Sequence, residues 1–305
     1  RGVGEIAREV ESSGGRINAF TSFDHTCYFV VMSSMFADAG VEVLSDAVRR
    51  STFDADELTN KLEVIREEIK RLADSPSRMA TQRLFETAYQ KHPYRRPIIG
   101  TDESISSLTR DDVLDFFNTH YVPENMALVL VGDIKDERAK SLADEHFGGD
   151  WGQSYTAPDR SDEPEQTAVR AQTESDSLQE TYLRLGFHIP DALDEDIPAI
   201  DLLGGILGRG DASHLVQSVE RQKGLVNDIS TTAYTPEDDG LFLCQASYQL
   251  GEDHSDAEIV QEILREMFLH RHVAVSEAAV DRAKTLIESQ EVYSKQTAQG
   301  LAMKM

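Results

Sequence analysis

Two adjacent carboxylates, Glu67 and Glu68, lie in a stretch whose apolar residues recur at helical spacing. The apolar stripe of this predicted helix consists of Leu58, Leu62, Ile65, Ile69 and Leu72. At about 100° per residue, Glu67 points about 180° away from the stripe, whereas Glu68 lies about 80° away, at its edge. We therefore expect Glu67 to be solvated and Glu68 to be able to face a cleft. The alternative, which helix geometry alone favours, is that Glu68 forms an ion pair with Arg71 on the next turn.

A second candidate is the strand-like segment that follows the glycine pair Gly14-Gly15. Its central residues are Asn18, Ala19, Phe20, Thr21 and Ser22. A strand at the edge of a sheet exposes unpaired backbone groups, which can accept an extended peptide as an added strand. An ordinary interior strand is the alternative, and the pattern alone favours it.

Several other catalytic signatures are absent. The sequence has no C-x-x-C, no G-x-S-x-G, no phosphate-binding loop and no histidine pair at i, i+4. Gly208-Arg209-Gly210 follows a predicted helix instead of a strand, so we interpret it as a turn. His270-Arg271-His272 ends a predicted helix, where basic groups suit the helix dipole.

The elements that must position these residues alternate between hairpins and helices. Strands are predicted at 14–23, 26–32, 126–131, 180–187, 225–234 and 241–248, and helices at 38–50, 54–72, from 109, 135–147, 196–207, 213–223, 256–270 and from 276. The run 26–32 is nearly continuously apolar, as in a strand that is covered on both faces. The pattern indicates an α+β fold of two homologous lobes, each an antiparallel sheet backed by helices.

The polar stretch 148–176, with Pro158 and Pro164, has almost no apolar periodicity and is the best linker. We expect a first lobe at 1–150, a linker at 151–176 and a second, degenerate repeat at 177–305. The chain starts at Arg1 without a methionine and ends inside a helical pattern, so we expect it to be part of a longer protein.

Composition limits the partners. The formal net charge is −25, from 55 acidic and 30 basic residues. This charge argues against nucleic acid or an anionic membrane as the main partner, and no apolar run is long enough to span a bilayer. Cys27 and Cys244 both lie in strand-like runs, where free thiols are expected more than a disulfide. The sequence does not distinguish a cytoplasmic from a periplasmic location.

Taken together, the ordered motifs resemble the pitrilysin/insulinase-like zinc peptidases, the M16-type inverted zincins. The matching segments are Gly14-Gly15 with Asn18-Ala19, Thr21, Asp24, Thr26 and Tyr28; Val64 to Ile69; His92-Pro93-Tyr94, Pro97 and Gly100; Tyr121 to Asn125; Val131-Gly132-Asp133; and Gly210 to Gly224. Their order across the chain, more than any single piece, carries the resemblance.

The resemblance implies a zinc metalloendopeptidase with one zinc ion. Its H-x-x-E-H motif, which supplies two histidine ligands and the general base, does not occur in the sequence and is expected before Arg1. By alignment with the family, Glu68 is the third ligand, and zinc would activate a water for attack on peptides bound along residues 18–22. Lys61 stands where the family often has an acidic residue, and it would not reinforce the metal. With this single ligand, the chain alone should bind zinc weakly or not at all.

The resemblance also implies partners: a peptide substrate and a second homologous half or subunit. Basic peptides would be weakly favoured by the acidic balance. The main alternative is a non-catalytic family homologue that binds a peptide or a partner subunit. A generic α+β binding domain would require the ordered motif matches to be chance.

Overall fold

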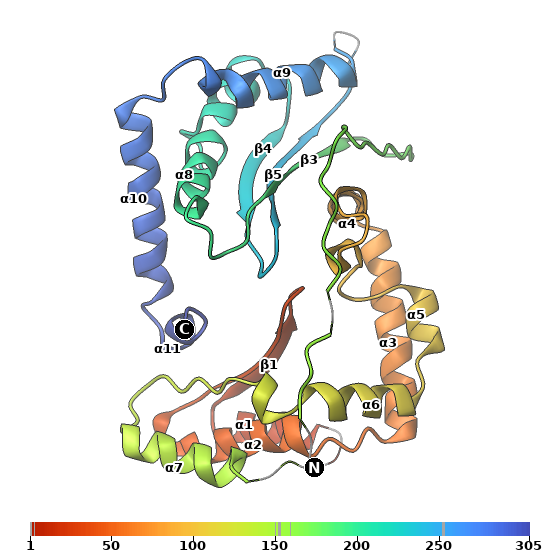
Figure 1. Cartoon of the computed structure of the whole chain (residues 1–305), viewed down its shortest axis with the longest axis vertical. Helices are drawn as coiled ribbons and strands as arrows, with labels where there is room; N and C mark the ends of the chain where they lie inside the picture. Colours follow the sequence, from red (N-terminus) through yellow and green to blue (C-terminus); the bar gives the residue numbers. More distant parts are fainter. Residues whose placement is uncertain (1, 3, 150, 152–153, 159, 252–253) are drawn as a thin grey trace. The chain divides into compact units, whose positions relative to one another are not determined.

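The computed structural model describes residues 2, 4–149, 151, 154–158, 160–251 and 254–305. They form two compact units (Figure 1). Unit 1 comprises Arg1–Lys70, Ile98–Asp159 and Tyr293–Met305, and unit 2 comprises Arg71–Pro97 and Arg160–Val292. Contacts therefore group residues 71–97 with the second half of the chain, although the sequence places them in the first. The lobe boundaries at 150 and 176 stay a prediction.

Unit 1 has a two-stranded antiparallel sheet with helices around it. Its elements are α1 (Glu5–Ser12), β1 (Arg16–Thr21), β2 (Thr26–Val31), η1 (Ser34–Phe36), α2 (Ala37–Arg49), most of α3 (Ala55–Ala73), α5 (Asp102–Ser107), α6 (Arg110–His120), η3 (Pro123–Asn125), α7 (Asp136–Phe147) and α11 (Ala298–Ala302). The buried apolar side chains of this unit include Val41 and Val43 on α2 and Leu142 on α7, and α2 packs against α7. The two helices predicted from 54 and from 109 begin at caps: Asp54 accepts the amides of Asp56 and Glu57, and Thr109 closes a capping box.

Two predictions for this unit are wrong. Residues 126–131 are not a strand, because a strand needs a ladder partner and none of the described strands pairs with them. Leu128 and Val129 are 37% and 39% exposed. The hairpin at β1 and β2 forms, but β2 is not covered on both faces, and Tyr28 is 39% exposed.

Unit 2 has a three-stranded antiparallel sheet in the order β3-β5-β4. Its elements are α4 (Pro76–Ala88), η2 (Pro93–Arg95), β3 (Thr181–Ile189), α8 (Ile197–Leu207), the π-helix η4 (Val216–Gln222), β4 (Asp228–Tyr234), β5 (Gly240–Tyr248), α9 (Asp256–Phe268), η5 (Leu269–Arg271) and nearly all of α10 (Glu277–Ser294). The predicted hairpin of β4 and β5 is confirmed, and the predicted strand at 180–187 corresponds to β3. The α+β class with antiparallel sheets is therefore confirmed.

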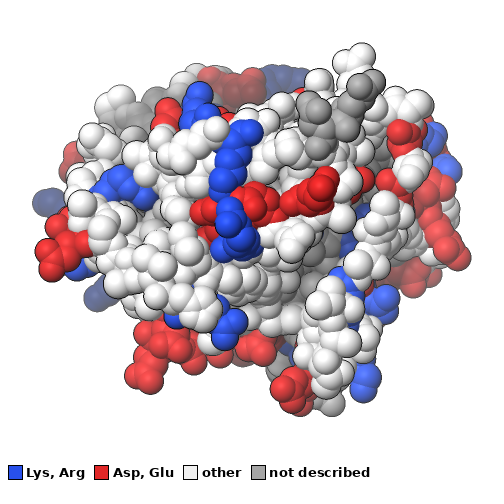
Figure 2. Space-filling model, turned by 90° about the horizontal axis from the view of Figure 1, so that it is seen from above, with Lys and Arg blue, Asp and Glu red and all other residues white. Residues whose placement is uncertain are grey.

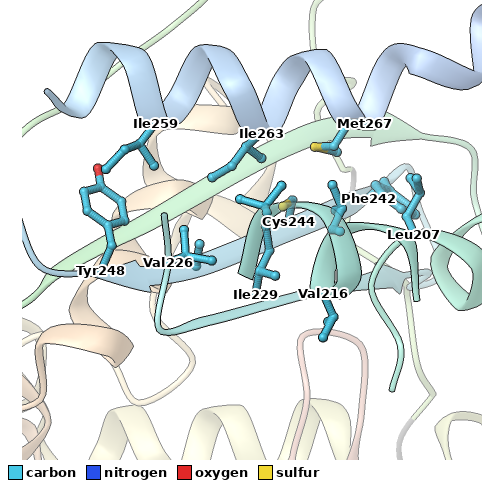
Figure 3. Close-up of a cluster of buried hydrophobic side chains, with 13 residues drawn as sticks. Leu207, Val216, Val226, Ile229, Phe242, Cys244, Tyr248, Ile259, Ile263 and Met267 are labelled. Atoms are coloured by element: carbon cyan, nitrogen blue, oxygen red, sulfur yellow. The ribbon is translucent and has the colours of Figure 1, made fainter. Parts of the chain in front are cut away.

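One face of this sheet carries a cluster of buried apolar side chains (Figure 3). On α9, Ile259, Ile263 and Met267 recur every four residues and point toward the sheet. They pack in one cluster with Ile229 of the edge strand β4 and Cys244 of the central strand β5. Burying each large apolar side chain contributes about 1.5–3 kcal/mol, so this face holds α9 on the sheet. Both cysteines are free, as the sequence predicts, but only Cys244 is buried, whereas Cys27 is half-buried.

The other face of the sheet is covered by α4. Leu84 packs over Gly186, 3.0 Å from the position that a Cβ would occupy there, so a larger residue at 186 would force the Leu84 side chain to move. At the end of α4, His188 Nε2 lies 3.1 Å from the carbonyl oxygen of Ala88. A helix from the first half of the sequence thus packs on a sheet from the second half.

Part of the predicted linker is bound to unit 2. We call residues 160–170 the strap. The Glu163 carboxylate accepts the backbone amides of Gln90, Lys91 and His92 at 2.7, 2.8 and 3.0 Å. Its side chain is only 9% exposed, and Arg170 lies 3.5 Å away. Burial alone would raise the pKa of Glu163, but these donors outweigh it and hold the pKa below its usual value.

The molecular surface has no large field of one sign on the face shown in Figure 2, where acidic and basic side chains lie interspersed. Unit 2 gives an example: Lys223 bonds to Glu262 and Glu266, and Arg265 bonds to the same two carboxylates. In the part of the chain that the structure describes, no helix has the length and apolar character needed to cross a bilayer.

The strap contact gives a testable prediction. Glu163→Ala leaves three backbone amides without their acceptor and should destabilise this contact by about 1–3 kcal/mol. Trypsin should then cut faster after Arg160 and Arg170, and Glu165→Ala, on the same strap, is the matched control. Equal cleavage of the two variants would contradict this role.

The same contact should depend on pH. Because the pKa of Glu163 is lowered in the folded protein, the contact contributes stability above the ordinary pKa of a glutamate. This stability is lost as the pH falls through the folded pKa.

Candidate functional site

The residues predicted to bind a peptide lie on β1 in unit 1. Asn18, Ala19 and Thr21 are exposed, and Phe20 is 43% exposed. In the described sheet, β1 pairs only with β2, so one edge of β1 has no strand partner among the described residues. Ser22 is half-buried at the turn that follows.

The register shows which backbone groups point to the free edge. The amide of Ser22 donates to the carbonyl of His25 at 2.8 Å, so this pair is hydrogen-bonded across the hairpin. Hydrogen-bonded and non-hydrogen-bonded pairs alternate in an antiparallel ladder. When this alternation is counted back through the observed register, the N–H and C=O groups of Phe20 point toward β2. Those of Ala19 and Thr21 point outward.

Two side-chain contacts agree with this alternation. The hydroxyls of Thr21 and Thr26 lie 3.1 Å apart, as expected for the closer, non-hydrogen-bonded pair. The Ala19 amide donates to its neighbour Asn18 Oδ1 at 2.8 Å. The outward amide at the centre of the edge is therefore satisfied locally, and an incoming strand must displace the Asn18 side chain to reach it.

Glu68 lies on α3, also in unit 1, and its side chain is exposed. The stripe residues of α3 are half-buried, as the helical wheel predicts. Glu67 accepts a hydrogen bond from Lys70 at 2.7 Å on the solvated face. No hydrogen bond or ion pair reaches Glu68 from any described residue, so the predicted alternative of a pair with Arg71 does not form there.

The acidic residues nearest Glu68 on the same helix, Glu63 and Glu67, are both paired with cations. Arg66 donates to Asp102 at 2.7 Å and to Glu63 at 3.0 Å. The hydrogen bond from Arg66 lowers the pKa of Asp102, and the two acceptors raise the pKa of Arg66. Glu68 thus differs from its acidic neighbours in having a carboxylate with no cation beside it.

The described residues do not form a zinc site on their own. They contain no group of three or more histidine, cysteine, aspartate or glutamate side chains that could hold a metal ion. A zinc ion needs three or four protein ligands, and Glu68 is one. No hydrogen bond or ion pair joins Glu68 to residues 18–22 in the described part of the chain.

Two motif residues whose contact the sequence did not predict come together in unit 1. The hydroxyls of Tyr28 and Tyr121 lie 2.7 Å apart, which ties β2 to the segment after α6. Burial is the main cause that raises the pKa of Tyr121, and this hydrogen bond raises it further. Both tyrosines belong to the motif segments, but their spacing of 93 residues carries no signal of contact.

The His-Pro-Tyr motif has a structural role in unit 2. The Tyr94 amide donates to His92 Nδ1, so the network assigns the ring proton to Nε2, which lies 3.2 Å from Asp238. The Asp238 amide donates in turn to the Tyr94 hydroxyl at 3.1 Å. These bonds fasten η2 to the β4–β5 turn.

Among the described residues, these observations define an α+β protein with two features: a hairpin strand, β1, whose outer edge has no strand partner, and a helix carboxylate, that of Glu68, without an ion pair. Comparison with known proteins identifies its family. Residues 1–102 match the family model described as "Insulinase (Peptidase family M16)", and residues 107–287 match "Peptidase M16 inactive domain". The second match covers more than half of the chain. The chain belongs to peptidase family M16.

Relatives agree with this assignment. The chain is 29% identical over 262 residues to the uncharacterized zinc protease YmxG of Bacillus subtilis, covering 85% of this chain and 63% of that protein. It is 29% identical over 287 residues to the zinc protease PqqE of Helicobacter pylori, covering 92% and 64%. A crystal structure of a protease from Helicobacter pylori superposes with a TM-score of 0.91 at 27% identity, covering 98% of this chain and 73% of that one. The chain therefore spans somewhat less than two thirds of these two curated relatives.

The hairpin register predicts a pattern of amide hydrogen exchange. Asn18 and Phe20 should exchange slowly because their amides bond to β2, and Ile17 and Thr21 should exchange fast because theirs point outward. Asn18→Ala should accelerate exchange at Ala19 alone, since it removes the local acceptor. Exchange measured residue by residue checks this, and slow Thr21 with fast Phe20 would show that the register is wrong.

Proposed function

We propose that this chain forms part of a zinc-dependent metalloendopeptidase that hydrolyses extended peptides bound by strand addition to β1. The observation that carries the proposal is the free edge of β1, where Ala19 and Thr21 present outward N–H and C=O groups. Membership of peptidase family M16, with relatives named zinc proteases, supports hydrolysis as the chemistry.

In this proposal, residues 18–22 bind the backbone of the substrate. Each added backbone hydrogen bond contributes about 0.5–1.5 kcal/mol, so the edge alone gives modest affinity. Side-chain pockets or an enclosure formed with a second homologous half or subunit must add the rest. Because backbone bonding tolerates many sequences, cleavage preference comes from those other surfaces.

Glu68 is proposed as one zinc ligand. Its exposed, unpaired carboxylate supports this role, in contrast to Glu67, which is paired with Lys70. The two histidines and the general base of the H-x-x-E-H motif are not in the sequence, so the proposal takes them from another part of the protein. A bound zinc would supply an activated water; within this chain, Glu68 would hold the ion and β1 would hold the peptide.

A non-catalytic homologue that binds a peptide or a partner subunit is the second candidate. It is favoured by the match of residues 107–287 to a domain described as inactive. Lys61, exposed two turns before Glu68 on α3, points the same way, because a cation there does not strengthen metal binding.

The strand-addition proposal predicts opposite behaviour for neighbouring prolines. Ala19→Pro removes an outward N–H and spares the ladder to β2, so it should weaken peptide cleavage by the full-length protein about 3- to 10-fold, the equivalent of one hydrogen bond. Phe20→Pro removes a backbone hydrogen bond between β1 and β2 instead and should lower the melting temperature of unit 1. Steady-state cleavage and thermal unfolding measure the two effects. Unchanged turnover in a folded Ala19→Pro variant would rule out β1 as the substrate strand.

The zinc proposal predicts a difference between adjacent glutamates. In the full-length protein, Glu68→Gln should abolish stoichiometric zinc binding, whereas Glu67→Gln, the matched control, should retain it. Elemental analysis after dialysis reports both. Loss in both variants, or only in Glu67→Gln, would mean that the alignment is wrong. Absence of zinc from the unmodified full-length protein would favour the non-catalytic candidate.

A further inference from the structure

Unit 2 contains a polar hollow at one end of its sheet, on the face that α4 covers only in part. Its volume is about 210 Å³, roughly the liquid volume of seven waters. It is lined by Ser77, Tyr182, Arg184, Asp228, Ser230, Gln245, Ala246 and Ser247. Three strands and the start of α4 contribute, so the walls belong to rigid elements.

Arg184 is the cation of this hollow. Its guanidinium donates to Ser77 O at 3.0 Å, Ser77 Oγ at 2.6 Å, Thr81 Oγ1 at 3.0 Å and Leu183 O at 2.9 Å. All four acceptors are neutral oxygens, and no carboxylate of a described residue forms an ion pair with it. A guanidinium has five N–H groups, so one on Nη1 keeps no acceptor among the described residues.

This arrangement leaves the guanidinium charge without an ion-paired carboxylate among the described residues. Burial lowers the pKa of Arg184, because the loss of solvation destabilises the charged form more than the nearby acidic groups stabilise it. A planar guanidinium is suited to carboxylate recognition.

The opposite charge is present at the same hollow. Asp228 is exposed, lines the hollow and lies near enough to Arg184 to interact electrostatically without forming an ion pair. Glu180 is nearby, bonded to Asn227 and to Tyr182. A dianion such as phosphate would meet both carboxylates, whereas a zwitterion can place its carboxylate at Arg184 and its ammonium at Asp228.

We infer that this hollow binds a small zwitterion of the α-amino acid or dipeptide class, with Arg184 holding the carboxylate and Asp228 the ammonium group. Ser230, Ser247 and Gln245 supply neutral hydrogen-bonding groups between the two charges. The site belongs to unit 2, whereas β1 and Glu68 belong to unit 1, and its occupancy does not depend on the proposed peptidase activity.

Binding of glycylglycine to the purified chain tests this inference. Heteronuclear NMR titration should show saturable shifts for residues around the hollow. Glycinamide, which lacks the carboxylate, and N-acetylglycine, which lacks the ammonium, should each bind about 10-fold more weakly, the loss expected for one charge-assisted contact. No saturable binding of glycylglycine, or equal binding of the three compounds, overturns the proposal.

Variants locate the site. Ser230→Leu fills the hollow without removing the bonds of Arg184 to α4 and should weaken glycylglycine binding at least about 10-fold. Ser177→Leu, an exposed position that does not line the hollow, is the matched control and should bind as the unmodified chain does. Asp228→Asn should weaken glycylglycine but leave N-acetylglycine unchanged. Retained glycylglycine affinity in a folded Ser230→Leu variant places the ligand elsewhere and overturns the assignment.

Discussion

The organisation of unit 2 depends on the contact between α4 and β3. Gly186 lets Leu84 approach the strand, and the bonds from Arg184 to Ser77 and Thr81 fix the start of the helix. At the other end, the Tyr89 hydroxyl donates to the carbonyl of Asp239 in the β4–β5 turn. Once α4 is held there, the amides that follow it converge on Glu163, and the His-Pro-Tyr motif reaches the same turn. The polar hollow is what α4 leaves uncovered, so it follows from the same contact.

The sequence was sufficient for features that depend on neighbours along the chain. Asp54 and Thr109 begin helices because each side chain accepts amides two or three residues ahead, and the hairpin β4–β5 follows from alternation around a polar turn. The helical wheel also placed Glu67 on the solvated face. Each of these features rests on a physical interaction within a few residues, which a periodic pattern can record.

Features that depend on distant partners were missed or wrong. The apolar run 126–131 has the composition of a strand, but strand formation requires a second strand and the pattern contains no information about it. The amides that bind Glu163 come from residues 71 or more positions earlier, and backbone amides have no sequence signature. The polar composition of 160–170 therefore gave no indication that this part of the predicted linker is bound in unit 2. For Glu68, periodicity gives the direction of the side chain, but it cannot show which groups elsewhere would complete the proposed zinc site.

The α4–β3 contact has a consequence for synthesis of the protein on the ribosome. His188 and Ala88 are 100 residues apart in sequence, so α4 leaves the exit tunnel long before the strand that covers it. At about 5–20 residues per second, the helix waits roughly 5–20 s with its apolar face in water or held by another molecule. Leu84 and Phe85, which pack on β3 and β4 in the folded protein, are then exposed to nonspecific association. Nascent chains of this protein should therefore depend on chaperones most strongly between the emergence of α4 and that of β3.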